Sequence, residues 1–479
     1  MQERLKYNFE PSDIADGDFH ALFSQRRRDS IFAYVYEKNG LIYAIRDHLG
    51  SVPLFYRRNG DDFNFATNLS ALAKADDVVD IQGLRLLIGL GSPKLHPPIE
   101  GIKSVPPGAV VELNKTTGAC RIIYQYRLHP RKISSSLTMR RLVEITDQLF
   151  LQAMTRIVRT DKVGLYLSGG IDSALIGFYL KKLGVQINAY TSAPWGKGSS
   201  EISFAQANAQ RIGVAQHFID FLETDKYADA LSAIPEIYGL PHGTSTGIGV
   251  SNLWRHTPIR DEQQIFFGQN SDTMTCSVPA QSLIYFVSLL PNVVQRRLGL
   301  AHDDLLKNYL SFTSRKFVRD FSPLQDVCDI TSLNRIQRLT VAGMYMAHSP
   351  SDGEVLAQPA IYKGIPTANP YYDMDLVEFC MGIPLHHRIA VAKEGKLPFT
   401  LEKKVFRARA LLYLPKEVVY RKKGFTVSMK RDETTQRLAE LLPHEINGMS
   451  VNDMESRVAA AIFIKWCEVN GLRATSPAL

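Results

Sequence analysis

The chain has 479 residues, of which 45% are hydrophobic, and a formal net charge of +8. This length favours two or three domains. The composition is that of a globular protein, and no apolar run is long enough to cross a membrane. The five dispersed cysteines lack C-x-x-C spacing, which argues for a reducing, cytoplasmic setting and against a zinc site. We interpret the basic clusters at residues 26–28 and 421–423 as solvated surface, and expect neither nucleic acid nor a membrane as partner.

The first 127 residues carry strand and turn patterns and are predicted to form an antiparallel β-rich domain. Three pairs of apolar or aromatic segments each flank a short turn. These pairs are residues 31–36 and 41–45, 54–56 and 63–66, and 110–113 and 122–124. Residues 128–138 are polar and contain Pro and Ser, so we expect a linker there.

From residue 139 to residue 479 the pattern changes to alternating helices and strands. The predicted helices are 139–158, 174–183 and 200–212, and the strands that follow them are 163–167, 187–191 and 216–219. A further strand is expected near 264–267, and the remainder should be mainly helical. This alternation predicts an α/β fold with a parallel sheet wrapped by helices. In such folds ligands bind beyond the carboxyl ends of the strands.

The most informative segment joins the strand at 163–167 to the next helix. Two adjacent glycines there would let backbone N–H groups approach a ligand, and the helix N-terminus favours phosphate. An aspartate in the turn can hold a divalent cation that bridges phosphates. The Walker spacing is absent. The segment instead resembles the S-G-G-x-D-S pyrophosphate loop of ATP pyrophosphatases, which implies ATP bound by Leu167, Ser168, Gly169, Gly170, Asp172 and Ser173.

Further motifs in the same chain order resemble the asparagine synthetase superfamily. In the synthetase half they are Gly268-x-x-Ser271-Asp272 and residues 369–373, 376–379, 403–408, 414–415 and 421–425. The segments 46–56, 65–67 and 101–108 resemble the back half of its class II, N-terminal-nucleophile (Ntn) glutamine amidotransferase domain. The resemblance implies a truncated amidotransferase-like domain over 1–127 and an ATP-pyrophosphatase-type synthetase domain over 139–479.

The N-terminal part departs from the family pattern. A glutaminase of this class needs cysteine as its mature first residue, because the free α-amine activates the thiol. Here Gln2 follows Met1, and the first cysteine is Cys120. We therefore expect no glutamine hydrolysis, a trait of relatives such as the β-lactam synthetases, the carbapenam synthetases and the lasso-peptide cyclases. The alternative is that a longer native N-terminus exists.

The resemblance also implies where metal and phosphate bind. Asp172 and Asp272 would hold Mg²⁺ between phosphate groups. Gly268 would lie beside the nucleotide. Lys403 would face the phosphates as a point charge, and its alternative is a solvated helix lysine.

The second chemical stage needs a lysine and a base. Lys423 stands eight residues after Pro415, the family's spacing for its catalytic lysine, whereas anchoring on the following Gly-Phe pair gives Lys422. Glu354 stands sixteen residues before Pro370, as does the glutamate of the Tyr–Glu base dyad of β-lactam synthetases. Gln269 occupies the place of the tyrosine. Glu354 is therefore a candidate general base, with an ordinary surface glutamate as the alternative.

Together these features predict an ATP- and Mg²⁺-dependent, AMP-forming carbon–nitrogen ligase. It would adenylate a carboxylate and join it to an amine, within one molecule or between two, in natural-product (antibiotic) biosynthesis. The substrate would be a small molecule or peptide, and homo-oligomer formation is left open. One alternative is an ammonia-dependent asparagine synthetase. The other is a non-catalytic partner protein, which Gln269 and Thr273 favour because the family carries other residues there.

Overall fold

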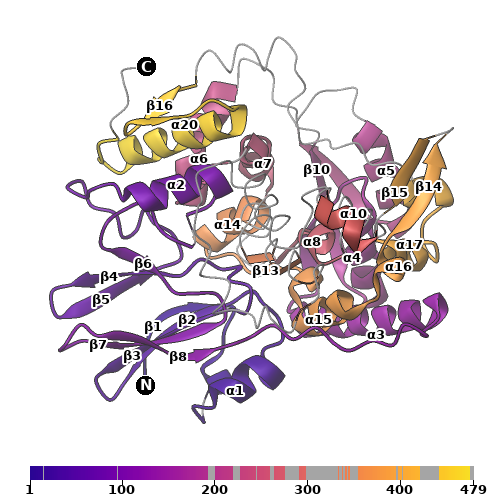
Figure 1. Ribbon diagram of the computed structural model, residues 1–479, viewed down its shortest axis with the longest axis horizontal. Helices are drawn as coiled ribbons and strands as arrows, with labels where there is room; N and C mark the ends of the chain where they lie inside the picture. The colour runs from indigo at the N-terminus through magenta and orange to yellow at the C-terminus, as the bar shows by residue number, and fades with distance from the viewer. Residues whose placement is uncertain are drawn as a thin grey trace.

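The computed structural model contains an antiparallel part near the N-terminus and a parallel sheet with surrounding helices (Figure 1). It describes residues 1–14, 16–93, 95–192, 200–219, 227–243, 245–258, 264–275, 291–297, 333, 337, 340–341, 344–345, 354–394, 397–401, 403–420 and 442–474.

The N-terminal part has two antiparallel sheets, with strand orders β1-β2-β3-β7-β8 and β5-β4-β6. The β2–β3 hairpin turns through Asn39 and Gly40, which both have positive φ, as a two-residue hairpin requires. All three predicted hairpins are confirmed. The strands are β1 (Gln2–Tyr7), β2 (Ala33–Lys38), β3 (Leu41–Arg46), β4 (Phe55–Asn59), β5 (Asp62–Ala66), β6 (Ile102–Ser104), β7 (Ala109–Asn114) and β8 (Cys120–Gln125). The helical segments are η1 (Pro11–Ile14), α1 (Phe19–Ala21), η2 (Leu22–Arg26) and α2 (Ile81–Leu90).

The second part contains the predicted parallel sheet, in the order β11-β10-β9-β12-β13. Its strands are β9 (Lys162–Tyr166), β10 (Gln186–Ser192), β11 (Ala215–Ile219), β12 (Gln264–Phe266) and β13 (Thr367–Ala368). The chain places β10 and β11 on one side of β9, and β12 and β13 on the other. The order therefore reverses between β9 and β12, and in sheets of this type ligands bind between the loops that leave two such strands.

Helices surround this sheet, and α3 shows why they form. Thr138 caps it by accepting the N–H of Arg141 at 3.3 Å, and its apolar residues recur on the face that is buried. Two short antiparallel hairpins lie in the region expected to be mainly helical. They are β14 (Ala390–Glu394) with β15 (Leu397–Leu401), and β16 (Glu445–Ile446) with β17 (Met449–Ser450). The helical segments are α3 (Met139–Ile157), α4 (Ile171–Lys182), α5 (Ser200–Ile212), α6 (Tyr227–Tyr238), α7 (Ser245–His256), α8 (Ser271–Met274), α10 (Asn292–Arg297), α14 (Glu354–Tyr362), η7 (Pro370–Tyr372), α15 (Met374–Gly382), α16 (Leu385–Arg388), α17 (Lys404–Ala410), α18 (Lys416–Val419) and α20 (Met454–Val469).

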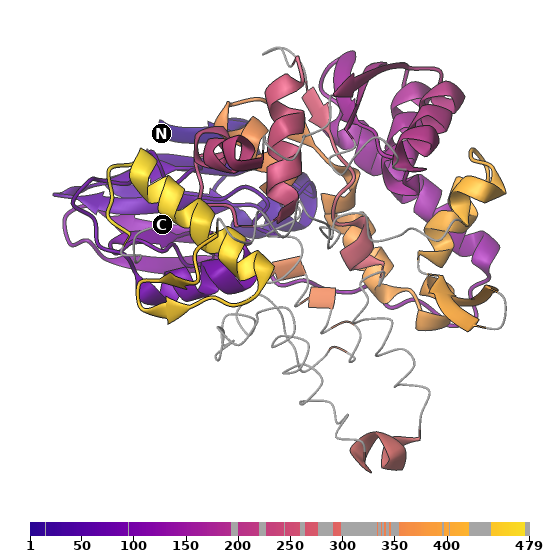
Figure 2. The same ribbon diagram turned by 90° about the horizontal axis from the view of Figure 1, so that it is seen from above.

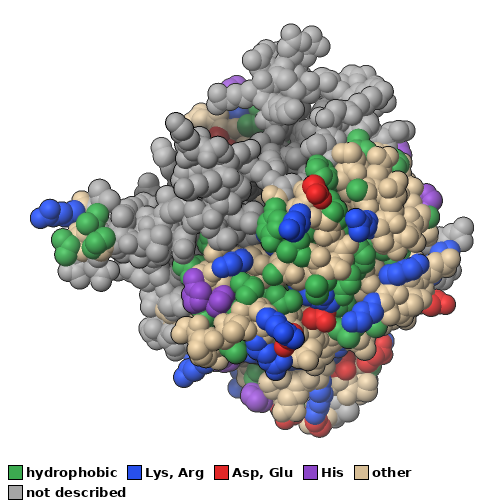
Figure 3. Space-filling model, turned by 90° about the vertical axis from the view of Figure 1, so that its right-hand side faces the viewer, with side chains coloured by type: hydrophobic (Ala, Val, Ile, Leu, Met, Phe, Trp, Pro, Cys, Tyr) green, Lys and Arg blue, Asp and Glu red, His purple; other side chains and the backbone are tan. Residues whose placement is uncertain are grey.

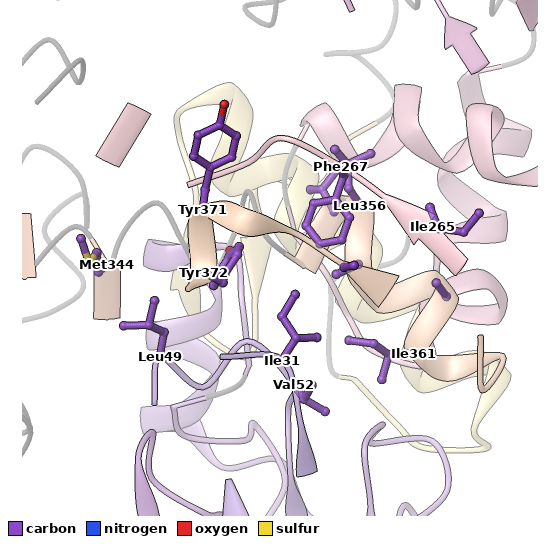
Figure 4. Close-up of a cluster of buried hydrophobic side chains, with 14 of the residues drawn as sticks. Ile31, Leu49, Val52, Ile265, Phe267, Met344, Leu356, Ile361, Tyr371 and Tyr372 are labelled. Atoms are coloured by element: carbon purple, nitrogen blue, oxygen red, sulfur yellow. The ribbon is translucent and has the colours of Figure 1, made fainter. Parts of the chain in front are cut away.

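One hydrophobic core runs through both parts. Figure 4 shows Ile31 and Val52 of the N-terminal part in the same buried cluster as Ile265, Leu356 and Tyr372. The C-terminal helix α20 packs against both α2 and α6, and Figures 1 and 2 agree that it lies over the N-terminal part. The two parts are therefore joined by apolar burial as well as by the chain.

A buried network of charges also crosses between the parts. Arg28 donates to Glu378 at 2.7 Å and to the Tyr126 hydroxyl at 3.1 Å, and its Nε lies 3.3 Å from Asp375. The segment before α3 takes part, because the N–H of Arg131 donates to the Glu378 carbonyl at 3.0 Å. Residues 128–138, expected as a linker, are thus attached to α15.

Asp373 joins this network through Arg156, which pairs with both Asp373 and Asp375. Burial raises the pKa of the Asp373 carboxyl to about 6 from an ordinary value near 3.8. Because the folded state binds the proton more tightly, this group should add stability below about pH 4 and lose it by about pH 6. We expect the stability of Asp373→Asn, which keeps a helix-capping side chain, to rise by about 2 kcal/mol relative to wild type between pH 4.5 and 7.5. Urea unfolding of both proteins at the two pH values measures this. If the difference in unfolding free energy between the two proteins is the same at both pH values, this prediction is wrong.

Charged side chains of both signs are interspersed on the molecular face that contains α3 (Figure 3). On α3 itself, Arg140 and Arg141 both pair with Glu144. Among the described residues, no helix combines the length and apolarity that a membrane span needs.

Candidate active site

The turn after β9 is held in shape by its own serines. Ser173 Oγ accepts the N–H of Ser168 at 3.0 Å, and the two hydroxyls lie 3.1 Å apart. Ser168 Oγ also accepts the N–H of Gly170, the residue that precedes α4. Asn208 of α5 donates to the Ser168 carbonyl at 3.1 Å. The turn is thus preorganised at the N-terminus of a helix of more than three turns, where backbone N–H groups attract phosphate.

The loop after β12 packs directly against this turn. A Cβ on Gly268 would lie only 3.2 Å from the Ser173 nitrogen and 3.4 Å from Asp172 Cβ, so glycine permits the close approach. Asn270 follows with φ of 73° and donates to the Tyr371 carbonyl at 2.7 Å. This conformation starts α8, which carries Asp272 in its first turn. Two segments a hundred residues apart are thereby joined at the switch point of the sheet.

Lys403 links the two aspartates. Its Nζ lies 2.6 Å from Asp172 Oδ2 and 2.6 Å from Asp272 Oδ1, and it donates to Ser271 Oγ at 2.8 Å. Burial opposes its charged form, but the two carboxylates outweigh burial and raise the pKa of Lys403 above its ordinary value. Because the side chain is only 6% exposed, the alternative of a solvated helix lysine is wrong.

The carboxylates are suited to a divalent cation. Asp172 Oδ1 is buried and has no hydrogen-bond partner within the described part of the chain, whereas the side chain of Asp272 is 57% exposed. A buried carboxylate oxygen without a donor is an unsatisfied ligand, and carboxylate oxygens are what Mg²⁺ binds. Tyr371 donates to the Asp172 carbonyl at 3.1 Å and fixes its backbone. The donor set therefore fits the magnesium that the sequence predicts here.

Glu354 lies in a buried polar cluster rather than on the surface. It begins α14, is 1% exposed, and accepts from Ser92 Oγ at 2.8 Å. His242 Nδ1 lies 3.3 Å from its other oxygen, and Tyr238 stacks on the imidazole. This burial excludes the surface-glutamate alternative, while the role of Glu354 as a base stays a prediction.

The topology places this cluster at the ligand-binding edge of the sheet. The α14 helix packs against β13, and a short connection joins its C-terminus to the start of that strand. A helix in that position runs antiparallel to the strand, so its N-terminus points to the carboxyl edge. Glu354 is thus at the same edge as the loops after β9 and β12.

The remaining predicted site residues have mixed outcomes. The backbone of Leu167 is used within the sheet, because its N–H donates to Tyr190 and its carbonyl accepts from Thr191. Lys422 and Lys423 lie outside the described residues. Site contacts that sequence reasoning did not identify come from Asn208, Ser271, Tyr371, His242 and Ser92. Of these five residues, Ser271 and Tyr371 belong to motifs that resemble the family.

Comparisons with known proteins agree with this arrangement. The model of the asparagine synthase family matches residues 146–465, and that of the glutamine amidotransferase domain matches residues 25–125. The chain is 32% identical over 157 residues to asparagine synthetase [glutamine-hydrolyzing] 3 of Bacillus subtilis strain 168, which covers 31% of this chain and 25% of the relative. It is 22% identical over 210 residues to asparagine synthetase [glutamine-hydrolyzing] 1 of the same organism, which covers 43% and 33%.

The chain thus spans about a quarter to a third of the length of these curated relatives. The family model itself covers about two thirds of this chain, and the resemblance drawn from the sequence motifs is confirmed. The chain belongs to the asparagine synthase family.

Proposed function

We propose that the protein is an ATP-dependent, AMP-forming ligase that activates a substrate carboxylate as an acyl-adenylate and joins it to an amine. The convergence of Asp172 and Asp272 on the ammonium group of Lys403, beside a preorganised helix N-terminus, carries this proposal. Such a site can neutralise the charge of a leaving pyrophosphate. Family membership supports the same chemistry.

In the first stage, a carboxylate oxygen attacks the α-phosphorus of ATP, and the bond to the β-phosphate oxygen breaks. The turn at 168–173 would bind phosphate oxygens through its N–H groups, and Lys403 would contribute a positive charge. Asp172 and Asp272 would hold Mg²⁺, which when bound supplies positive charge between phosphates.

In the second stage, the amine nitrogen attacks the acyl carbon and AMP leaves with the bonding electron pair. The amine must lose a proton, and we assign its acceptance to Glu354. His242, whose Nδ1 lies 3.3 Å from Glu354, would act as its partner in place of the tyrosine of the Tyr–Glu dyad. Lys423, or Lys422 in the alternative alignment, would stabilise the charge of the tetrahedral intermediate.

We also propose that this enzyme does not hydrolyse glutamine. In the described part of the chain, Cys120 is exposed on the outer strand β8, and Cys380 and Cys467 are buried. Burial raises the pKa of the Cys467 thiol to about 12, which suppresses the reactive thiolate. None of these thiols has the free α-amine that this class of glutaminase uses. The substrate amine would then come from ammonia, a second molecule or the same molecule, as in natural-product cyclisation.

The two relatives are named as asparagine synthetases, so an asparagine synthetase is the competing proposal, with L-aspartate and ammonium as its substrates here. We expect AMP and pyrophosphate, rather than ADP and orthophosphate, once a cognate acid is supplied. Hydroxylamine traps acyl-adenylates as hydroxamates, so a panel of aspartate, other amino acids and N-acylated amino acids can be screened without knowing the amine. Glutamine should yield no glutamate. ADP formation with a cognate acid would refute the proposal, and hydroxamate from aspartate alone would select the asparagine synthetase alternative.

A further inference from the structure

The position between the two site aspartates is taken by a side chain of this protein. We propose that Lys403 is a resident cation that keeps this two-aspartate site closed to divalent metal until metal arrives together with a triphosphate. The inference deepens the proposed function and rests on it for the identity of the nucleotide. It predicts that a metal–nucleotide complex binds, and that the free metal ion binds only weakly.

The geometry of Lys403 is that of a fully coordinated cation. An ammonium group has three N–H donors. Here its acceptors are Asp172 Oδ2 at 2.6 Å, Asp272 Oδ1 at 2.6 Å and Ser271 Oγ at 2.8 Å. All three donors are therefore satisfied, two of them by one oxygen of each carboxylate of the predicted metal site.

The backbone holds the lysine in this place. Lys403 has φ of 59°, which is uncommon for a residue with a Cβ, and it precedes α17. Val405 and Phe406 are buried just beyond it, and its carbonyl accepts the N–H of Arg407 at 2.8 Å. The main chain of Lys403 is anchored on the helix side, so the lysine would release the carboxylates by movement of its side chain.

The charges explain why metal alone is a poor competitor. Two carboxylates and one ammonium leave a single net negative charge, and a divalent ion placed beside Asp172 would meet the ammonium at close range. Expelling the buried ammonium without a new anionic partner would leave its charge unpaired, which is costly. A triphosphate supplies that partner, since phosphate oxygens accept from lysine. Displacement is then favourable only when both ligands arrive.

Manganese(II) alone is the direct probe, measured by electron paramagnetic resonance of the free ion. Wild type should bind it weakly, and Lys403→Met should bind it about tenfold tighter or more, because a positive charge leaves and two carboxylates are uncovered. The Asp172→Asn, Lys403→Met double variant should lose the gain. Lys403→Arg, which keeps a cation, is the matched control and should resemble wild type.

Three results would overturn the proposal. The first is that wild type binds Mn²⁺ as tightly as Lys403→Met does. The second is that the gain in Mn²⁺ affinity persists in the Asp172→Asn, Lys403→Met double variant. The third is that Lys403→Arg gains as much Mn²⁺ affinity as Lys403→Met. If Lys403→Met does not fold, wild type alone decides the matter: calorimetry should detect binding of the preformed manganese–α,β-methylene-ATP complex, and Mn²⁺ alone should bind about tenfold more weakly or worse. Failure of the nucleotide complex to bind wild type would reject the proposed function, whereas the effect of Lys403→Met on Mn²⁺ alone would still test the resident cation.

Discussion

Asp172→Asn is expected to weaken binding of the magnesium–α,β-methylene-ATP complex by on the order of a hundredfold, the scale of losing one preorganised electrostatic contact. Asp172 supplies a buried carboxylate oxygen without a partner in the described part of the chain, and its other oxygen holds Lys403. The amide keeps the shape of the side chain and removes its charge. Because this analogue cannot be split between the α- and β-phosphates, calorimetry measures binding without the unknown acid.

Asp161→Asn is the matched control, since this exposed aspartate lies just before β9, at the opposite end of the strand from the turn. It should bind the complex as wild type does. Thermal unfolding of both variants verifies that they are folded. If the Asp172 variant binds as tightly as the Asp161 control, the carboxylate does not hold the nucleotide's metal and the site assignment fails.

The turn at 168–173 could be predicted from sequence because its main determinants are local, although Asn208 and Tyr371 also hold its backbone. Strand, glycines, acid and helix lie within a few residues, and the serines that shape the turn bond to one another. The second loop was found only through the family motif at 268–272. That Gly268 touches Asp172 depends on the strand order β9-β12, which the alternation of elements does not specify.

The contacts of Glu354 with Ser92 and His242 could not be predicted from the sequence, because they also depend on how distant segments pack. Ser92 follows α2 in the N-terminal part, and His242 follows α6, so neither has a spacing that relates it to Glu354.

Asn208 lies in the middle of α5, where asparagine is a weak helix former, and that is the only local signal it gives. The hairpins β14–β15 and β16–β17 were missed because short strands pair locally and carry little periodicity.

These contacts join the N-terminal part to the segments around Glu354. Ser92 donates to Glu354, and Gly91 accepts the backbone N–H of Gly243, next to His242. A Cβ on Gly243 would lie 2.6 Å from the Cβ of Ala459, so α20 presses on the same segment. The N-terminal part and α20 therefore both contact the segments that surround Glu354.

Arg28→Met is expected to cost about 3–5 kcal/mol of stability, because it leaves the buried Glu378 carboxylate without its charged partner. The two side chains are 8% and 9% exposed, so water cannot replace the lost contact. Glu378→Gln should cost a similar amount. The double variant should lose less stability than the two single variants together, because neither charge is then left buried without its partner. Such non-additivity indicates that the two side chains interact directly.

Arg131→Met is the matched control for that pair. Its guanidinium also contacts the interface, at 2.8 Å from Asp375, but it is 42% exposed and should contribute at most about 1 kcal/mol. Urea unfolding followed by fluorescence and by circular dichroism measures all four variants, and separation of the two transitions in Arg28→Met would indicate that the parts unfold independently. Equal stability of the Arg28 and Arg131 variants would mean that apolar burial, rather than this charge network, joins the two parts.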